Sequence, residues 1–101
     1  MEDWSRYEPK FRYMMLSRMK QDCDYYLGNG EGSTNHLWAQ DEQAQIDNMV
    51  AIWATFAQED KPEWLTWGDL IYYALRMGAK ISTRPKYVMY FRKNREDEGD
   101  E

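Results

Sequence analysis

Few side chains in this chain of 101 residues could take part in catalysis or hold a metal. His36 is the only histidine, and Cys23 is the only cysteine. A single histidine excludes multi-histidine metal sites and most acid–base designs. Cys23 falls on the apolar face of an expected helix, where a free cysteine behaves as a small buried hydrophobe and not as a nucleophile. We therefore expect neither an enzyme nor a bound cofactor.

A second group of candidate metal ligands begins at Asp22 and precedes residues 28–32, which contain three glycines. An EF-hand loop starting at Asp22 would need an oxygen ligand at position five, glycine at six and glutamate at twelve. Those three positions hold Tyr26, Leu27 and Ser33. The calcium pattern fails, and the Lys-Ser/Thr ending of a phosphate-binding loop is missing as well. We interpret residues 28–40 as a helix-to-helix connection, which Leu37 and Trp38 anchor to the core.

The charged residues are distributed unevenly in a chain of net charge −5. Residues 21–75 carry ten acids and one base, residues 76–95 carry seven bases and no acid, and residues 96–101 carry five acids. Such asymmetry can mark an interaction surface. It is equally explained by internal compensation, in which the basic segment lies on the acidic helices, or by simple solvation.

One functional interpretation is that the acidic helices imitate nucleic acid and occupy a basic groove of another protein. The acids that would imitate nucleic acid are Asp22, Asp24, Glu31, Asp41, Glu42, Asp47, Glu59, Asp60 and Glu63. The candidate protein-binding residues are Asp22, Asp24, Glu31, Asp41, Glu42 and Trp64. An exposed Trp64 would form an edge of the interaction surface. We expect it to be buried instead, because tryptophan is highly buried on average.

The opposite interpretation is that the basic segment binds nucleic acid. Basic groups neutralise phosphates, and aromatic rings stack on bases. The candidate residues are Arg84, Lys86, Tyr87, Tyr90, Arg92, Lys93 and Arg95. The acidic body and the acidic tail beside this segment would repel a polyanion.

Compartment and membrane association follow from simple composition. No apolar run approaches the roughly 18 residues of a membrane span. The first residues lack the basic and apolar regions of a secretory signal. A single cysteine cannot form an internal disulfide, which favours a reducing compartment. We expect a cytoplasmic protein that does not associate with membranes.

The first helix is expected over residues 9–27. Methionines are plentiful and β-branched residues few, which favours helix packing over a sheet. Pro9 suits the first turn of a helix, and Gly28 suits its end. The apolar positions at helical spacing are Phe11, Met15, Met19, Cys23, Tyr26 and Leu27.

The second helix is expected to begin at Asp41 and to end near Ala57 or Gln58. The negative charge of Glu42 is stabilising in the first turn of this helix, at the positive end of the helix dipole. The apolar stripe follows the i, i+3, i+4, i+7 pattern of a half-buried helix. Its members are Ile46, Met49, Val50, Trp53, Phe56 and Ala57.

The start of the third helix is the most clearly predicted local structure in the sequence. Thr66 is expected as the N-cap and Asp69 as its capping-box partner, while Leu65 and Leu70 occupy the positions of a hydrophobic staple. Gly78 is the expected stop. The residues expected to face inward are Trp67, Leu70, Ile71, Ala74 and either Leu75 or Met77.

These elements predict a mainly α protein with one compact three-helix domain at residues 9–78. Residues 1–8 form a lead-in. Residues 79–95 form a basic, aromatic extension that is irregular or contains a short strand. Residues 96–101 form an acidic tail that is expected to be disordered.

Several separated motifs between Tyr13 and Met77 resemble, in order and spacing, the large polyvalent protein-associated domain, type eleven. The matching segments include Leu16-Ser17-Arg18-Met19, Asp22-Cys23-Asp24-Tyr25-Tyr26-Leu27-Gly28, His36-Leu37-Trp38-Ala39 and Pro62-Glu63-Trp64-Leu65-Thr66. Gln40 departs from the family pattern, which often has glycine there. The resemblance implies an accessory module of phages and conjugative elements in a bacterial cytoplasm. It implies no catalytic residue.

The functional hypothesis is therefore a non-enzymatic mobile-element accessory protein that contacts a host or element protein. Its sharper form is a counter-defence inhibitor, of the anti-CRISPR or anti-restriction type. The alternative is an accessory protein that binds nucleic acid through the basic, aromatic C-terminal segment.

Overall fold

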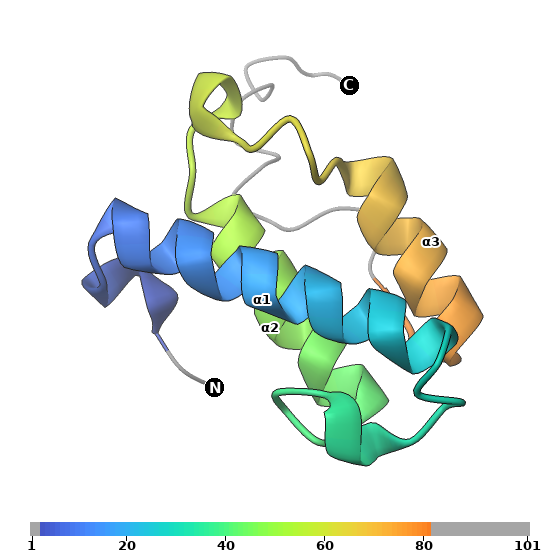
Figure 1. Ribbon diagram of the computed structural model, residues 1–101. Helices are drawn as coiled ribbons and strands as arrows, with labels where there is room; N and C mark the ends of the chain where they lie inside the picture. Colours follow the sequence, from blue (N-terminus) through green and yellow to red (C-terminus); the bar gives the residue numbers. More distant parts are fainter. Residues whose placement is uncertain (1–2, 82–101) are drawn as a thin grey trace.

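The computed structural model describes residues 3–81, which form three α-helices joined by irregular links (Figure 1). The elements are η1 (Trp4–Arg6), α1 (Pro9–Leu27), η2 (Thr34–His36), α2 (Glu42–Ala54), η3 (Gln58–Asp60) and α3 (Trp67–Met77). No strand occurs in the described part of the chain, so the mainly α, three-helix prediction is confirmed. Most of the expected extension and the whole expected acidic tail lie outside the described residues.

Helix α1 has the expected bounds. Pro9 stands in its first turn, and the Gly28 backbone N–H closes the helix on the carbonyls of Asp24 and Tyr25, at 3.0 and 3.1 Å. The buried side chains are Met15, Leu16, Met19, Cys23 and Tyr26. Leu16 was not expected on the inner face, and the two outermost expected positions, Phe11 and Leu27, are only partly buried.

Helix α2 starts as expected but ends early. Asp41 caps it, since the carboxylate accepts the Ala44 backbone N–H at 2.8 Å. The helix ends at Ala54 and not at residues 57 or 58, because the Thr55 hydroxyl donates back to the Ile52 carbonyl at 2.6 Å and the chain then turns into η3. Phe56 is nevertheless buried, whereas the expected core residue Ala57 is exposed.

Helix α3 confirms the expected start and stop. The Thr66 hydroxyl accepts the Asp69 backbone N–H at 3.1 Å, and the Asp69 carboxylate accepts the Thr66 backbone N–H at 2.9 Å. Leu65 and Leu70 are fully buried, as a hydrophobic staple requires. Gly78 adopts a left-handed conformation with φ of 75°, which favours glycine.

The inner face of α3 includes a residue that the stripe did not predict. Met77 is buried and Leu75 is 74% exposed, which decides between the two alternatives at this position. Tyr73 is buried as well, whereas Ile71, which was expected to face inward, is only partly buried and does not belong to the core. The Tyr73 hydroxyl reaches Asp24 on α1, 49 residues away in the sequence, and no local pattern encodes such a contact.

The three helices all contact one another, and one buried amide joins α1, α2 and the connection between them. Gln45 is fully buried on α2. Its side-chain oxygen accepts the Ala39 backbone N–H at 2.9 Å, and its nitrogen donates to the Met19 carbonyl at 3.2 Å. Both ends of the amide are therefore satisfied, as a buried polar group requires. Leu37 is buried beside this connection, which confirms its predicted anchoring role. Trp38, which was given the same role, is 37% exposed and contacts the body through the Trp4 ring, at a centroid distance of 5.8 Å.

Replacement of Thr66 by alanine tests how far the cap stabilises the fold. Thr66→Ala removes the acceptor of the Asp69 backbone N–H, so we expect the free energy of unfolding to fall by about 1 kcal/mol. Thr66→Ser keeps the hydroxyl and should stay near the parent. Urea unfolding followed by circular dichroism measures both variants. Equal losses in the two variants would contradict a role for the hydroxyl.

Candidate interaction surface

The acidic residues predicted to bind protein gather at one end of the molecule. This acidic end consists of the last turns of α1, the connection at residues 28–41 and the first turn of α2 (Figure 1, lower right). Two hydrogen bonds join its parts. The Tyr26 hydroxyl donates to Glu42 at 2.5 Å, and the Trp38 backbone N–H donates to Asp22 at 2.9 Å. Residues 21–60 contain no lysine or arginine.

Most of these carboxylates also stabilise the fold. Asp41 is the cap of α2, and Asp22 and Glu42 accept the two bonds just described. Asp24 accepts the Tyr73 hydroxyl at 2.5 Å and pairs with Lys20 at 3.0 Å, the only ion pair within residues 3–81. Glu31 is exposed and holds a left-handed backbone conformation, with φ of 54°.

Exposed aromatic rings accompany the carboxylates at the acidic end. Tyr25 is 47% exposed and Trp38 is 37% exposed. The Tyr25 ring meets the edge of His36 at a centroid distance of 4.7 Å, and the backbone passes close by at Gly30. A Cβ on Gly30 would lie 2.8 Å from the Tyr25 carbonyl oxygen, so this position needs glycine. Sequence reasoning missed Tyr25 because it lies outside the apolar stripe of α1.

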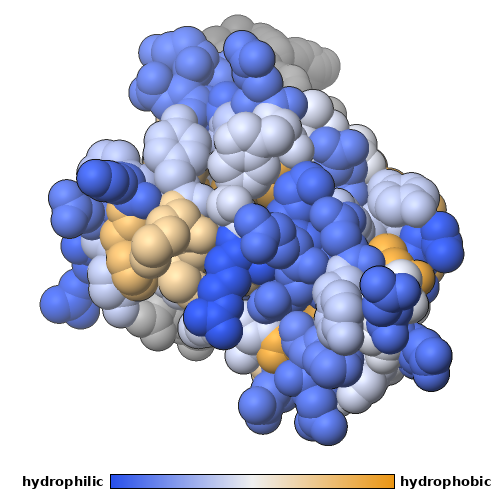
Figure 2. All heavy atoms as spheres, viewed as in Figure 1, coloured by the Kyte–Doolittle hydropathy of each residue, from blue (hydrophilic) through white to orange (hydrophobic). Residues whose placement is uncertain are grey.

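Figure 2 shows the character of the surface in this region. Hydrophilic and weakly polar side chains cover most of the lower part of the visible face, with few apolar atoms between them. The acidic end is thus a polar surface that carries aromatic rings, and not an apolar patch. This composition matches the rims and aromatic contact residues of protein–protein interfaces.

Hydrogen bonding and burial shift the pKa values of the tyrosines that hold these carboxylates. The bond to Glu42 raises the pKa of Tyr26 to about 12. Burial, together with the bond to Asp24, raises the pKa of Tyr73 further above the ordinary value. Both hydroxyls are therefore protonated donors at neutral pH. Each hydroxyl is a neutral donor, so its bond to the carboxylate adds no positive charge to the acidic end.

Cys23 lies beneath the acidic end and is fully buried, as expected. Its sulfur lies 3.6 Å from the Met49 sulfur. Burial raises the pKa of the Cys23 thiol to about 12, with Asp22 and Asp24 adding to the shift. The thiolate needed for nucleophilic attack is thus disfavoured at neutral pH.

The expected burial of Trp64 is wrong, since this side chain is 43% exposed. A turn explains the difference, because the Leu65 backbone N–H donates to the Pro62 carbonyl at 3.4 Å. The turn directs Pro62 and Leu65 inward, and both are buried. Glu63 and Trp64 lie between them and face outward. Trp64 also precedes α3 and does not belong to the acidic end.

The candidate nucleic-acid-binding residues, Arg84 to Arg95, lie outside the described residues. Their proposed role therefore stays a prediction. Within the described part of the chain, no group of three His, Cys, Asp or Glu side chains could hold a metal ion. No described helix is both long enough and apolar enough to cross a membrane.

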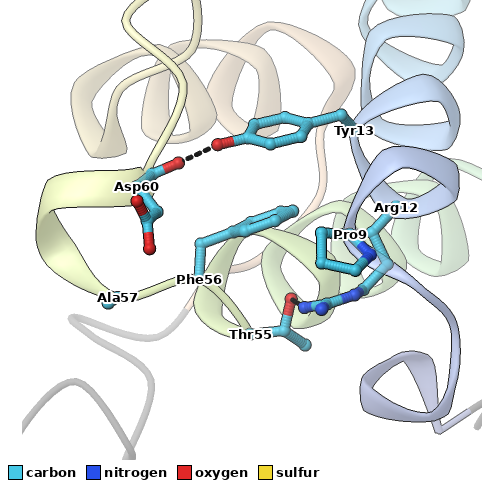
Figure 3. A pocket seen from close by; sticks show the side chains of 7 residues that line it. All are labelled: Pro9, Arg12, Tyr13, Thr55, Phe56, Ala57 and Asp60. Atoms are coloured by element: carbon cyan, nitrogen blue, oxygen red, sulfur yellow. Dashed lines mark hydrogen bonds between the residues drawn. The ribbon is translucent and has the colours of Figure 1, made fainter.

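A hollow of about 340 Å³ lies between the start of α1 and residues 55–60 (Figure 3). The Arg12 guanidinium lies over the Phe56 ring at 4.8 Å and donates to the Thr55 hydroxyl at 2.6 Å. Tyr13 stacks on the same ring and donates its hydroxyl to the Asp60 carbonyl. The lining contains no cysteine, serine, lysine or histidine. The contacts of Arg12 and Tyr13 tie α1 to the segment that follows α2, which is a structural role.

The family comparison covers the part of the chain in which this geometry lies. The model of the large polyvalent protein-associated domain 11 family matches residues 9–77, more than half of the chain. The chain belongs to this family. The domain 11 match confirms the resemblance noted above, and it spans α1, the acidic end, α2 and α3. No curated protein and no solved structure matches the chain.

The raised pKa of Tyr26 predicts a loss of stability in alkali. Folding raises the pKa of Tyr26, so the folded protein holds this proton more tightly than the unfolded chain does. The resulting stability is complete below pH 10 and is lost as the pH rises through about 12. Cys23 acts in the same direction, from its ordinary value of 9 upward. Tyr26→Phe removes one titrating group and should reduce the fall in unfolding free energy between pH 9 and pH 11.5.

Tyr25→Phe is the matched control, because it removes a neighbouring hydroxyl that is exposed. Urea midpoints at the two pH values measure all three proteins. The fall in unfolding free energy between the two pH values should be the same in Tyr25→Phe and the parent, and it should be smaller in Tyr26→Phe. An identical pH dependence in Tyr26→Phe and the parent would contradict the assignment.

Proposed function

We propose that the chain is a non-enzymatic accessory protein of a mobile genetic element, and that it acts by binding another protein. Membership of the large polyvalent protein-associated domain 11 family supports the accessory role. The observation that carries the binding role is the acidic end. There, exposed Tyr25 and Trp38 stand among carboxylates in a stretch of 40 residues, 21–60, without lysine or arginine.

The acidic end has the two properties that recognition of a basic protein requires. Exposed aromatic rings supply contact area at low entropic cost and are enriched among the residues that dominate binding energy. Carboxylates of one sign steer a positively charged partner and speed its association. Hydrogen bonds hold Asp22 and Glu42 in place before binding, so fewer side chains lose freedom when the partner docks.

The sharper form of the proposal is a counter-defence inhibitor that acts in the bacterial cytoplasm. A nuclease of a CRISPR or restriction system must present basic groups to bind the phosphate backbone. An acidic surface with aromatic rings offers the same groove negative charge and ring faces. The acidic end would then compete with nucleic acid for that groove.

A nuclease-inhibition assay with paired charge reversals tests this function. Purified protein is added to a panel of CRISPR and restriction nucleases, and cleavage of their DNA is measured against its concentration. Glu31→Lys reverses one exposed charge at the acidic end, and it should raise the concentration needed for half-inhibition about tenfold or more. Lysine can adopt the left-handed backbone conformation of residue 31 about as easily as glutamate, so the substitution should not disturb the fold.

Glu59→Lys is the matched control, since it reverses an exposed charge in η3 at the other end of the molecule (Figure 1). It should inhibit like the parent. Equal effects of the two reversals would refute binding through the acidic end. An absence of inhibition across the panel would count against the counter-defence form.

The same preparations separate this proposal from the nucleic-acid alternative. Salt-sensitive binding to DNA or RNA that disappears when residues 79–95 are removed would favour that alternative. Nuclease inhibition that survives the same deletion would favour protein binding. The two results involve different parts of the chain and can be scored independently.

A further inference from the structure

The outer face of α3 is apolar and exposed. Its stripe consists of Gly68, Ile71, Tyr72 and Leu75, which follow the i, i+3, i+4, i+7 spacing of one helix face. Leu75 is 74% exposed and Tyr72 is 50% exposed. Arg76 borders the stripe, with its guanidinium 5.6 Å from the centre of the Tyr72 ring and donating to the Tyr72 hydroxyl at 2.7 Å. Helix α3 lies at the margin of the molecule (Figure 1). A surface helix normally has charged or polar residues on its outer side, so this face needs an explanation.

Gly68 provides a second, independent observation. Glycine is less favourable than alanine in a helix interior, and Gly68 is the second residue of α3. Nothing inside the molecule requires it, because Gly68 lacks the positive φ that favours glycine. A Cβ built at this position meets only the Thr66 hydroxyl, at an ordinary contact distance of 3.6 Å. The missing side chain instead leaves space on the outer face, where another chain could approach the helix closely.

The α3 surface is complementary to itself when two copies run antiparallel. This arrangement places the protruding Leu75 of each copy opposite Gly68 of the other, so the same contact forms at both ends of the pair. Tyr72 then lies near the two-fold axis. Asp69 and Arg76 lie on one flank of the stripe, near opposite ends of the helix. Antiparallel pairing brings Asp69 of one copy towards Arg76 of the other, and it also opposes the two helix dipoles.

We propose that the protein forms a symmetric dimer through antiparallel pairing of α3. A second copy is the occupant because α3 itself supplies the matching protrusion, the matching space and the matching charges. One short helix from each chain buries less area than a standard interface of about 1,600 Å². The dimer is therefore weak and depends on protein concentration. It uses a face other than the acidic end and does not rest on the proposed function.

Sedimentation equilibrium of the full chain across a concentration series tests the dimer. The parent should show a monomer–dimer equilibrium. Gly68→Leu fills the space with a side chain and should weaken dimerisation at least about tenfold, while circular dichroism shows an intact fold. Leu75→Ala should weaken it to a similar extent. The double variant Gly68→Leu with Leu75→Ala moves the protruding side chain to position 68 and the space to position 75. The two surfaces should then fit again, and dimerisation should recover much of its strength.

Met14→Ala is the control, since it removes another large exposed apolar side chain, 56% exposed, on α1. It should dimerise like the parent. A parent that stays monomeric at every concentration would overturn the proposal. So would a folded Gly68→Leu that dimerises like the parent, a Met14→Ala that dissociates like Leu75→Ala, or a double variant with no recovery. Nuclease inhibition measured on Gly68→Leu reports on the acidic end separately.

Discussion

The arrangement of the helices depends on the contacts of one buried side chain, Trp53 of α2. Its indole N–H donates to the Leu65 carbonyl at 2.9 Å, which fixes the residue before the cap of α3. The Lys61 ammonium lies 4.6 Å from the same ring, and the Trp67 ring lies 5.5 Å away. Burial lowers the pKa of Lys61, whose ammonium also donates to the Phe56 carbonyl at 2.5 Å. One indole therefore positions the irregular link and the helix that follows it.

The sequence predicted the features that depend on neighbouring residues, and it missed those that depend on distant ones. Pro9, Thr66 and Gly78 act within a single turn, so their roles could be identified from residue type and spacing. The clustering of the acids followed from composition, but their hydrogen-bond partners did not. Tyr73 and Asp24 meet across 49 residues. The exposure of Trp64 was missed because a turn, and not average tryptophan burial, decides it.

The way in which the carboxylates are satisfied determines the electrostatics of the acidic end. Internal compensation by the basic segment stays an alternative, because five of its seven bases, from Arg84 onward, lie outside the described residues. Within residues 3–81, Lys20 with Asp24 is the only ion pair. At the acidic end, a tyrosine hydroxyl holds Glu42, and backbone N–H groups hold Asp22 and Asp41. Neutral donors order a carboxylate without cancelling its charge. Within the described residues, the acidic end thus combines fixed geometry with a negative potential that Lys20 offsets at Asp24 alone, and electrostatic steering requires this combination.

The burial of Cys23 has a practical consequence. It is the only thiol in the chain, it is fully buried on α1, and its sulfur contacts Met49 on α2. A thiol reagent can reach it only after these helices separate. The labelling rate therefore measures how often the pair opens under native conditions. Cys23 is therefore a native reporter of local opening between α1 and α2, and no residue has to be introduced to measure it.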